Sequence, residues 1–294
     1  MNGYLLVTNS SAGSNEDEAV ESARAVLAEK GPVEVVATGA PEELDEVLRA
    51  ADGRTVVVAG GDGSLHAVVN ALHRLDLLDS VPIGLVPLGT GNDFARGIGI
   101  ELEPAKAAEL IAVTEPEPLD LVLDSTGTIM VNNAHLGVGA EASRSGAGWK
   151  RRIGRAGYAV GALSAGLNPD FVRVRVLVDG VGVYSGRVAQ VAVGNGPDVG
   201  GGTELVPGAD PSSRTLTVIV SRAVGPLNRL LYAIRLRRGE HHLMREVSRM
   251  TGSVVNVSGG EFRLSTDGEL SGPHRSITWE LLPGVLRMHQ PRPD

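Results

Sequence analysis

The hydrophobic pattern of the first 120 residues alternates between two periods. Short β-branched runs are typical of buried parallel strands, and between them lie apolar residues at spacings of three and four, which are typical of helices. This alternation predicts an α/β domain with a doubly wound parallel sheet. The expected strands are Gly3–Thr8, Val33–Thr38, Thr55–Ala59 and Ile83–Val86, and the expected helices are residues 14 to about 30, 41–49 and about 65–72.

From about residue 119 the pattern changes to many short strands separated by Gly, Asp and Pro turns. This pattern predicts a second, mainly antiparallel β domain. We therefore expect domains at residues 1–118 and 119–282, and the last residues, about 283–294, can return to the first domain. The expected strands are residues 119–123, 129–136, 172–178, 188–193, 216–220, 254–257, 261–265 and 276–281, with helices near 154–165 and 227–236.

The segment Gly60–Ser64, with sequence GGDGS, stands between the third predicted strand and its helix. Glycines permit a tight turn and close approach of a ligand to the backbone, and Ser64 is a candidate N-cap. Backbone N–H groups at a helix start form an anion site. Asp62 does not fit a plain anion site, because a carboxylate there repels a phosphate unless a divalent cation or a transferable proton lies between them. The segment thus suggests phosphoryl transfer with a metal–nucleotide complex. An ordinary structural turn would explain the glycines but not the aspartate.

A second glycine-rich segment, residues 87–96 with sequence PLGTGNDFAR, follows the next strand. Ligands of doubly wound sheets bind beyond the carboxyl ends of the strands, so the two segments can share one phosphate site. Asn92 or Asp93 can cap the short helix that follows. Asp93 is also a second candidate for holding a metal or a water.

Composition and charge narrow the choice of partners. The chain has no Cys, which excludes disulfides and thiolate metal sites. It has no uninterrupted apolar run long enough to cross a bilayer, and its N-terminus lacks the features of a signal peptide. Residues 1–120 hold 7 Lys+Arg and 21 Asp+Glu, a balance of −14, whereas residues 121–294 hold 20 and 14, a balance of +6. The acidic half argues against nucleic acid as a ligand, and the basic half can face an anionic membrane or substrate.

Several motifs in a fixed order resemble the diacylglycerol kinase catalytic-domain family, which includes sphingosine and ceramide kinases and bacterial soluble lipid kinases. The resemblance covers nearly the whole chain, and the combination of motifs is specific although no single motif is. The motifs are TNSSAG, GGDGSLHAVVNAL, PLGTGNDFARGIGI, LDLVLDSTGTIMVNNAHLGVGAEA, WKRRIGRAGYAVGAL, GGGTELVPGAD and STDGELSG.

The resemblance implies an NAD kinase-like nucleotide domain, a C-terminal β-sandwich that binds the lipid, and ATP with Mg²⁺ in the cleft between them. It assigns the catalytic residues Glu269, Asp62, Asp93 and Asp120, with Asp62 organising the catalytic Mg²⁺ and Asp93 and Asp120 contributing through water. Glu269 matches the family's proton acceptor. The nucleotide-binding residues implied are Asn9, Ser10, Gly13, Thr38, Gly60, Gly61, Asp62, Gly63, Ser64, Gly89, Thr90, Gly91 and Asn92.

The residues themselves support these roles unequally. Asp267-Gly268 is first of all a hairpin turn, so Glu269 by itself reads as a solvated strand residue. A hydroxyl that is phosphorylated must lose a proton, however, and a carboxylate can accept it. The chain departs from the family at Ser10, where Pro is usual, and at His66-Ala67, where Asn-Glu is common. Arg214 stands near the position of a structural Mg²⁺ in bacterial relatives, and a cationic side chain argues against that site here.

We therefore expect a cytoplasmic, peripherally membrane-associated enzyme of phospholipid metabolism that transfers the γ-phosphoryl group of ATP to a lipid, with diacylglycerol as the first candidate. Two basic stretches interleaved with apolar residues, 144–155 and 222–245, are either solvated surfaces or contacts with an anionic membrane. A homodimer is possible, and the sequence does not decide whether one forms. The alternatives are an NAD kinase-like small-molecule kinase and a non-catalytic protein that binds lipid or nucleotide on the same scaffold.

Overall fold

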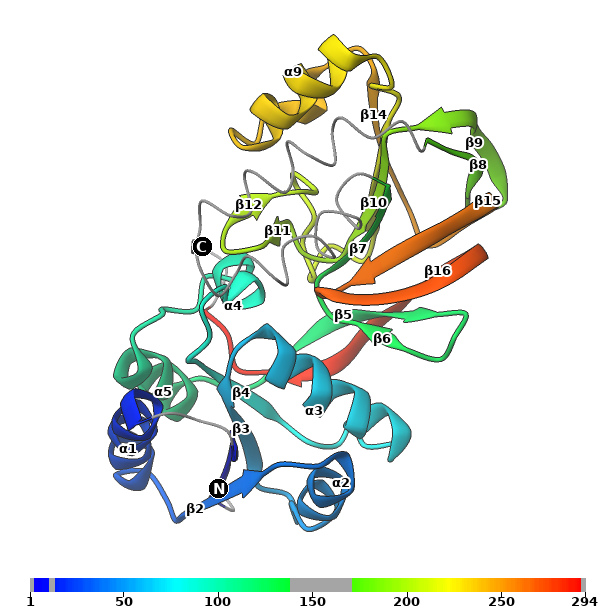
Figure 1. The fold of residues 1–294 in the computed structure, drawn as a ribbon. Helices are drawn as coiled ribbons and strands as arrows, with labels where there is room; N and C mark the ends of the chain where they lie inside the picture. Colours follow the sequence, from blue (N-terminus) through cyan, green and yellow to red (C-terminus); the bar gives the residue numbers. More distant parts are fainter. Residues whose placement is uncertain (1–2, 11–13, 138–170, 292–294) are drawn as a thin grey trace. The chain divides into compact units, whose positions relative to one another are not determined.

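The computed structural model describes residues 3–10, 14–137 and 171–291 (Figure 1). The chain divides into two compact units: unit 1 comprises residues 1–121 and 282–294, and unit 2 comprises residues 122–281. Three expected features lie outside the described residues: Gly13, the helix near 154–165 and the basic stretch 144–155.

Unit 1 contains a parallel sheet in the strand order β2-β1-β3-β4. Its third strand, Thr55–Gly60, is Val-rich and buried along almost its whole length, as expected for a central parallel strand. The elements are β1 (Tyr4–Asn9), α1 (Ser14–Ala28), β2 (Val33–Thr38), α2 (Pro41–Arg49), β3 (Thr55–Gly60), α3 (Asp62–Arg74), β4 (Ile83–Pro87), α4 (Asp93–Gly97) and α5 (Pro104–Val113).

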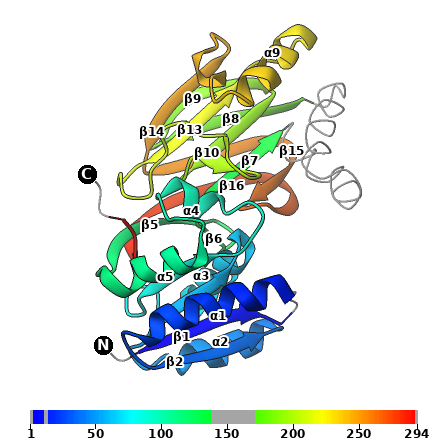
Figure 2. The ribbon, with the colours of Figure 1, turned by 90° about the vertical axis from the view of Figure 1, so that its left-hand side faces the viewer.

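Two pairs of helices cover the two faces of this sheet. Helix α1 packs on α5, and α2 packs on α3. Figure 2 shows α1 and α5 on one face and α2 and α3 behind the strands. The predicted doubly wound parallel sheet is confirmed.

One predicted boundary in unit 1 is wrong. Ser64 is not the N-cap of α3, because the helix begins two residues earlier, at Asp62, and its N-cap is Gly61. Gly61 adopts an extended conformation (φ −94°, ψ −168°), so the chain turns into the helix directly at the end of β3. Ser64 lies inside the first turn, where its hydroxyl packs closely over Gly60.

Unit 2 is built from antiparallel strands, as predicted. The order along one layer is β14-β13-β10-β7-β15. Its elements are β6 (Ile129–Met130), β7 (Asn133–Gly137), β8 (Val172–Val178), β9 (Val181–Val188), β10 (Gln190–Gly194), β11 (Asp198–Val199), β12 (Thr203–Glu204), β13 (Leu216–Ser221), α9 (Pro226–Leu236), η1 (His241–Leu243), β14 (Val247–Gly252) and β15 (Val254–Thr266).

The long strand β15 joins two layers. Its residues 255–259 pair with β8, and its residues 264–266 pair with β7, with register shifts between Ser258 and Leu264. The main core includes Trp279 at 1% exposure and contains side chains from the strands of both layers. This arrangement matches a sandwich, in which the inner faces of two layers share one core.

Two further strands contribute to both units: β5 (Glu117–Asp124) and β16 (Glu269–Met288). In unit 1, Met288 of β16 pairs in parallel with Ile83 of β4. In unit 2, β16 pairs with β15 through a hairpin whose turn is Asp267-Gly268. In the described parts of the chain, no helix combines the length and the apolar character needed to cross a membrane.

Candidate active site

The two glycine-rich segments touch at the carboxyl ends of β3 and β4. A Cβ atom placed on Gly61 would lie 2.9 Å from Cα of Gly89, and one placed on Gly89 would lie 2.6 Å from Cα of Gly61. Leu88 N–H donates to the carbonyl of Gly60 at 3.0 Å. Only glycine allows backbones to approach this closely, so both predicted segments belong to one structure.

The carboxylate of Asp62 has a structural partner that the sequence did not reveal. Its Oδ2 accepts the backbone N–H of Asp93 and its Oδ1 accepts that of Phe94, each at 3.0 Å. Asp62 thus binds the first turn of α4, where free N–H groups and the helix dipole favour a negative charge. The aspartate therefore needs neither a cation nor a proton to be tolerated in this turn.

The carboxylates of Asp62 and Asp93 nevertheless converge. A Cβ atom on Gly91 would lie 3.0 Å from Oδ2 of Asp62 and 3.4 Å from Oδ2 of Asp93. Asp93 is 7% exposed, and each Asp62 oxygen keeps a second lone pair beyond its amide hydrogen bond. Two nearby carboxylates in a partly buried site are a donor set that fits Mg²⁺, which takes one or two protein carboxylates and completes its shell with water and phosphate.

Asp120 lies on β5 and is almost fully buried, with 1% exposure. Its Oδ1 accepts the backbone N–H of Gly284 at 2.8 Å, which ties β5 to the returning C-terminal segment of unit 1. Among the residues that the structure describes, no three Asp, Glu or His side chains are placed to hold one metal ion together. A metal at Asp62 and Asp93 would need water or ligand oxygens for the rest of its shell.

Asn92 adopts a left-handed conformation (φ 52°, ψ 43°) and is 6% exposed. Its Nδ2 donates to the carbonyl of Gly89 at 2.7 Å, which fixes the side chain in the loop. Its Oδ1 is buried without a hydrogen-bond partner among the described residues and lies next to Gly61 and Gly89. A buried acceptor without a donor costs free energy, so this position suits a ligand or water that donates a hydrogen bond.

Asn9, Ser10 and Thr38 lie at the same edge of the sheet, at the carboxyl ends of β1 and β2. Asn9 pairs with Thr38, and Ser10 N–H donates to the Thr38 carbonyl at 3.0 Å. Gly63, in the first turn of α3, and Thr90, in the loop after β4, are exposed. The described residues predicted to bind nucleotide thus lie at the carboxyl ends of β1, β2, β3 and β4, in the turns that follow them or in the first turn of α3.

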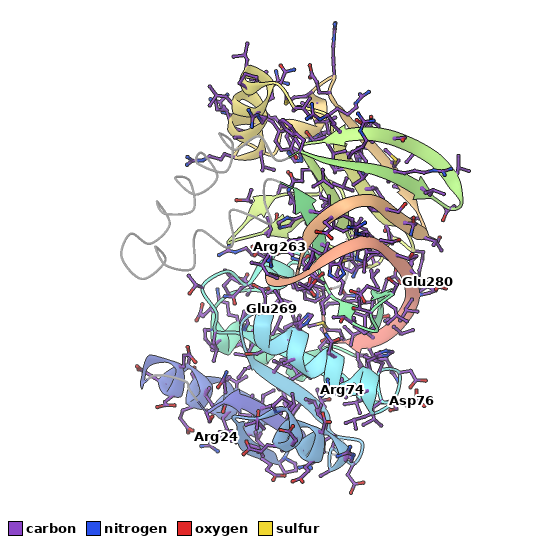
Figure 3. The ribbon with its side chains drawn as sticks, turned by 45° about the vertical axis from the view of Figure 1, so that its right-hand side comes forward. Arg24, Arg74, Asp76, Arg263, Glu269 and Glu280 are labelled. Atoms are coloured by element: carbon purple, nitrogen blue, oxygen red, sulfur yellow. The ribbon has the colours of Figure 1, made fainter. Side chains whose placement is uncertain are left out.

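Glu269 is the first residue of β16 and is exposed (Figure 3). It pairs with Thr266 across the two-residue turn, in which both residues have positive φ (Asp267, 48°; Gly268, 92°). These angles match the type I′ turn that Asp-Gly predicts. The turn therefore holds Glu269 at the tip of a defined hairpin.

Asp267 positions this hairpin, a role that no pattern in the sequence indicated. Its carboxylate accepts three backbone N–H groups, those of Val131 at 2.7 Å, Asn132 at 2.9 Å and Asn133 at 3.1 Å. The side chains of Asn132 and Asn133 in turn donate to the carbonyl of Asp198, at 2.7 and 2.6 Å. No spacing rule connects these residues, because they meet only through the antiparallel pairing of β15 with β7.

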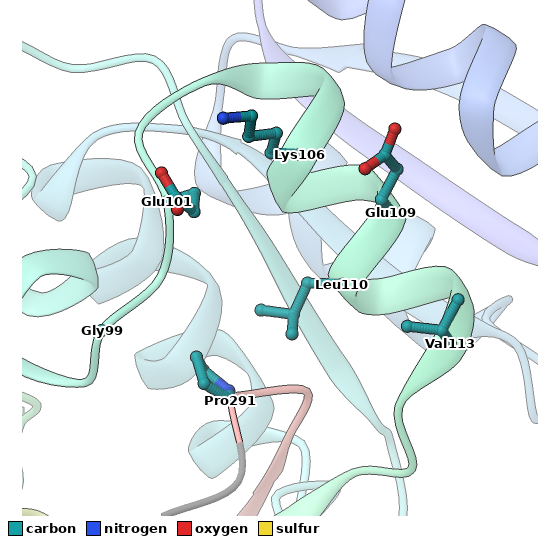
Figure 4. Close-up of a pocket in the computed structure, with 7 residues that line it drawn as sticks. All are labelled: Gly99, Glu101, Lys106, Glu109, Leu110, Val113 and Pro291. Carbon is teal, nitrogen blue, oxygen red and sulfur yellow. The ribbon is translucent and has the colours of Figure 1, made fainter.

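Two other places in the fold bear on the expectations. Asp210, near the position where Arg214 argues against a structural Mg²⁺, closes an exposed turn: its carboxylate accepts the N–H of Ser212 at 2.8 Å and the hydroxyl of Ser212 at 2.7 Å. A hollow of about 620 Å³ in unit 1 is lined by none of the predicted site residues (Figure 4). Its lining consists of Gly99, Glu101, Lys106, Glu109, Leu110, Val113 and Pro291.

Known families and proteins match the chain along its length. The diacylglycerol kinase catalytic domain matches residues 3–123, and the YegS C-terminal NAD kinase beta sandwich-like domain matches residues 132–290. A protein of Xanthomonas campestris pv. campestris named "Probable lipid kinase YegS-like" is 30% identical over 302 residues, which cover 98% of this chain and 96% of that protein. A protein of the same name from Stenotrophomonas maltophilia is 31% identical and covers 80% of this chain and 78% of its own.

Solved structures share the fold. A crystal structure described as a diacylglycerol kinase from Bacillus anthracis has a TM-score of 0.80 at 23% identity, covering 99% of this chain and 97% of that one. An NAD kinase from Archaeoglobus fulgidus in complex with ATP has a TM-score of 0.53 at 14% identity, covering 98% and 93%. With the two domain matches and the relatives at 30% identity or more, the resemblance read from the motifs is confirmed: the chain belongs to the YegS-like lipid kinase family and carries a diacylglycerol kinase catalytic domain.

Proposed function

We propose that this protein transfers the γ-phosphoryl group of ATP to the hydroxyl group of diacylglycerol. The observation that carries the proposal is the pair of touching glycine loops at the ends of β3 and β4, beside which the carboxylates of Asp62 and Asp93 converge. In a lipid kinase family, such a site suits the phosphates of ATP. The similar Bacillus anthracis protein is described as a diacylglycerol kinase, which favours diacylglycerol as the acceptor.

The proposed roles follow the geometry within unit 1. The segment Gly60–Ser64 at the start of α3 binds the phosphates, and Oδ1 of Asn92 accepts a hydrogen bond from the nucleotide or its water. Asp62 and Asp93 would hold Mg²⁺, which neutralises charge on the phosphates, and Asp120 would act through water. Asn9, Ser10, Gly13, Thr38, Gly89, Thr90 and Gly91 complete the proposed nucleotide site.

In unit 2 we propose Glu269 as the acceptor of the proton that the lipid hydroxyl loses. Its exposure leaves the carboxylate accessible to a substrate, and Asp267 fixes the hairpin that carries it. A positioned general base contributes about 10²–10⁴-fold to a rate. On this proposal unit 1 is the nucleotide domain, unit 2 is the lipid domain, and the protein acts at a membrane surface.

Glu269→Gln is the cleanest test of this mechanism. Asp62→Asn would also remove an acceptor from the first turn of α4 and so change stability. Glu269 is exposed at the tip of its hairpin, and a matched control, Glu280→Gln, changes an exposed glutamate near the other end of the unit 2 part of β16 (Figure 3). We expect Glu269→Gln to lower turnover by about 100-fold or more with an unchanged melting temperature, and Glu280→Gln to leave both unchanged.

The assay uses radiolabelled ATP with Mg²⁺ and separates products by thin-layer chromatography. The acceptors are diacylglycerol, monoacylglycerol, phosphatidylglycerol, ceramide and sphingosine in mixed micelles, with NAD in a separate reaction. Label in diacylglycerol supports the proposal, and label in another lipid corrects the acceptor. Label in NAD alone, or ATP binding without transfer to any acceptor, overturns it in favour of an NAD kinase-like enzyme or a binding protein.

A further inference from the structure

Helix α9 exposes an apolar stripe. Among the described residues, eleven large hydrophobic side chains are exposed, and five of them lie between residues 227 and 243. Four of these sit on α9 at spacings of three and four, which places them on one face of the helix. They are Leu227 (75% exposed), Leu230 (46%), Leu231 (41%) and Ile234 (44%), which we call the α9 stripe, and Leu243 of η1 (66%) follows.

The opposite face of α9 is anchored, so the stripe cannot turn inward. Tyr232 is 6% exposed, and its hydroxyl donates to Oε1 of Gln190 at 2.6 Å. Its ring meets the ring of His241 edge-on, with centroids 5.5 Å apart, and His241 is itself fully buried. A helix of a globular protein normally turns its aliphatic face to the core, whereas α9 turns it to solvent.

Arginines flank the stripe along the chain. Residues 222–245 contain six arginines and a single acidic residue, Glu240. Arg222 is engaged with the backbone carbonyls of Arg245 and Glu246, and the guanidinium of Arg229 lies 5.1 Å from the ring centroid of Phe171. Arg237 and Arg238, just past the end of α9, are exposed, as is Arg245.

The charge of this face decides between occupants. A second copy of the chain would bring two arginine-rich faces together, and like charges oppose such a contact. Nucleic acid would use the arginines but leave the aliphatic stripe in water. An anionic bilayer satisfies both, because apolar side chains enter the boundary of the acyl chains while arginines contact the lipid phosphates.

We propose that α9 and η1 anchor the protein to the surface of an anionic phospholipid membrane, with the α9 stripe inserted and Arg237, Arg238 and Arg245 on the headgroups. This inference rests on the proposed function, since an enzyme that phosphorylates a membrane lipid must reach the bilayer. It goes further by assigning the contact to named side chains.

The test is co-sedimentation of the full chain with phosphatidylcholine vesicles, with or without phosphatidylglycerol. We expect binding to the anionic vesicles that weakens as salt is added. Leu227→Gln/Leu231→Gln should weaken it by about tenfold or more, and Arg237→Gln/Arg238→Gln by about 30-fold. The controls are Val113→Gln, an aliphatic residue 72% exposed on α5, and Arg49→Gln on α2, and they should bind as the wild type does.

Sedimentation does not depend on turnover, so this proposal and the proposed function can fail separately. With short-chain diacylglycerol dispersed in water, the stripe and arginine variants should keep wild-type activity, whereas with vesicle substrate they should lose it. Vesicle binding that is unchanged in the stripe variant would overturn the proposal. So would a dimer that the stripe variant dissociates, or a fall in its melting temperature well beyond that of Val113→Gln, since the stripe would then be covered by protein.

Discussion

At the scale of single residues, Asp62 has a structural role that is compatible with the catalytic role we propose for it. From the sequence, its charge was unexplained without a cation or a proton, and the structure supplies two backbone N–H groups of α4 instead. Those bonds also hold the carboxylate beside Asp93, where a cation could bind. The structural role therefore prepares the proposed catalytic one rather than replacing it.

A substitution of Gly63 should affect protein stability and ATP binding in opposite directions. Gly63 lies in the first turn of α3, its φ is not positive, and a Cβ atom there would meet nothing within 4 Å. Gly63→Ala should therefore stabilise the protein by about 0.5–1 kcal/mol, because alanine loses less backbone entropy in a helix. If ATP phosphates approach this turn, the added methyl group should weaken ATP binding by roughly tenfold or more.

Calorimetric titration with ATP and thermal denaturation measure these two effects separately. Gly225→Ala is a suitable control, since a Cβ atom at Gly225 also meets nothing within 4 Å but the residue caps α9 in unit 2. It should leave ATP affinity unchanged. Full ATP affinity in Gly63→Ala would show that the phosphates bind elsewhere.

At the scale of elements, the β15–β16 hairpin depends on Asp267. In the wild type, both oxygens of the Asp267 carboxylate accept hydrogen bonds from backbone N–H groups. In Asp267→Asn, the side-chain NH₂ would replace one of these oxygens and face a backbone N–H that has no acceptor. Losing a charge-assisted bond and leaving a donor unpaired should cost about 2–3 kcal/mol. Because Glu269 sits two residues away, turnover should fall as well.

Urea unfolding followed by tryptophan fluorescence measures this cost in unit 2, to which both tryptophans, Trp149 and the buried Trp279, belong. Asp210→Asn is the comparison, because Asp210 holds only an exposed turn, and it should change stability by less than about 1 kcal/mol. Equal effects of the two substitutions would argue against a special role for Asp267.

The elements that could be predicted from the sequence are those with a clear period and a clear stop. Residues 33–38, 41–49 and 172–178 have the predicted bounds, since Pro or Gly turns flank strongly patterned runs. Strand β9 was not predicted, because its sequence VGVYSGRV contains two glycines and its side chains are largely exposed. Residues 254–257 and 261–265 were predicted as two strands but form one, because an irregular register carries β15 past Gly259 and Gly260.

The candidate site divides in a similar way. Each of the two glycine loops could be predicted, because the turn residues within a loop are neighbours in the sequence. The hydrogen bonds that the carboxylates of Asp62 and Asp267 accept from backbone N–H groups could not be predicted. Their partners lie 31 and about 135 residues away and meet these carboxylates only in the folded chain. Helix α5 was also missed, although its Pro104 stands at a typical first position.

At the scale of the whole molecule, buried histidines make folding sensitive to acid. Burial lowers the pKa of His135 from 6.5 to about 4, and burial is also the main cause that lowers the pKa of His241 to about 4. Both lie in unit 2, and burial likewise lowers the pKa of His289 in unit 1. The native state therefore keeps these rings neutral at a pH where the unfolded chain takes up protons.

The sign of the pH dependence follows from this difference. Between pH 6.5 and about 4 the unfolded state binds more protons than the native state, so stability falls as the pH falls. At pH 5 the loss should be about 2 kcal/mol for each of His135 and His241, relative to pH 7. Urea unfolding of unit 2 at the two pH values, followed by tryptophan fluorescence, measures the sum of the two losses.

Replacing one histidine at a time isolates its contribution to the loss of stability between pH 7 and pH 5. His135→Gln and His241→Gln should each reduce the difference in unfolding free energy between pH 7 and pH 5 by about 2 kcal/mol, whatever each costs at pH 7. Each variant is the control for the other, because the two rings lie on different elements, β7 and η1. A pH difference that stays at the wild-type value in both variants would mean that other groups govern the acid sensitivity. A smaller difference in both variants would show that the two buried, neutral imidazoles make unit 2 less stable at pH 5 than at pH 7.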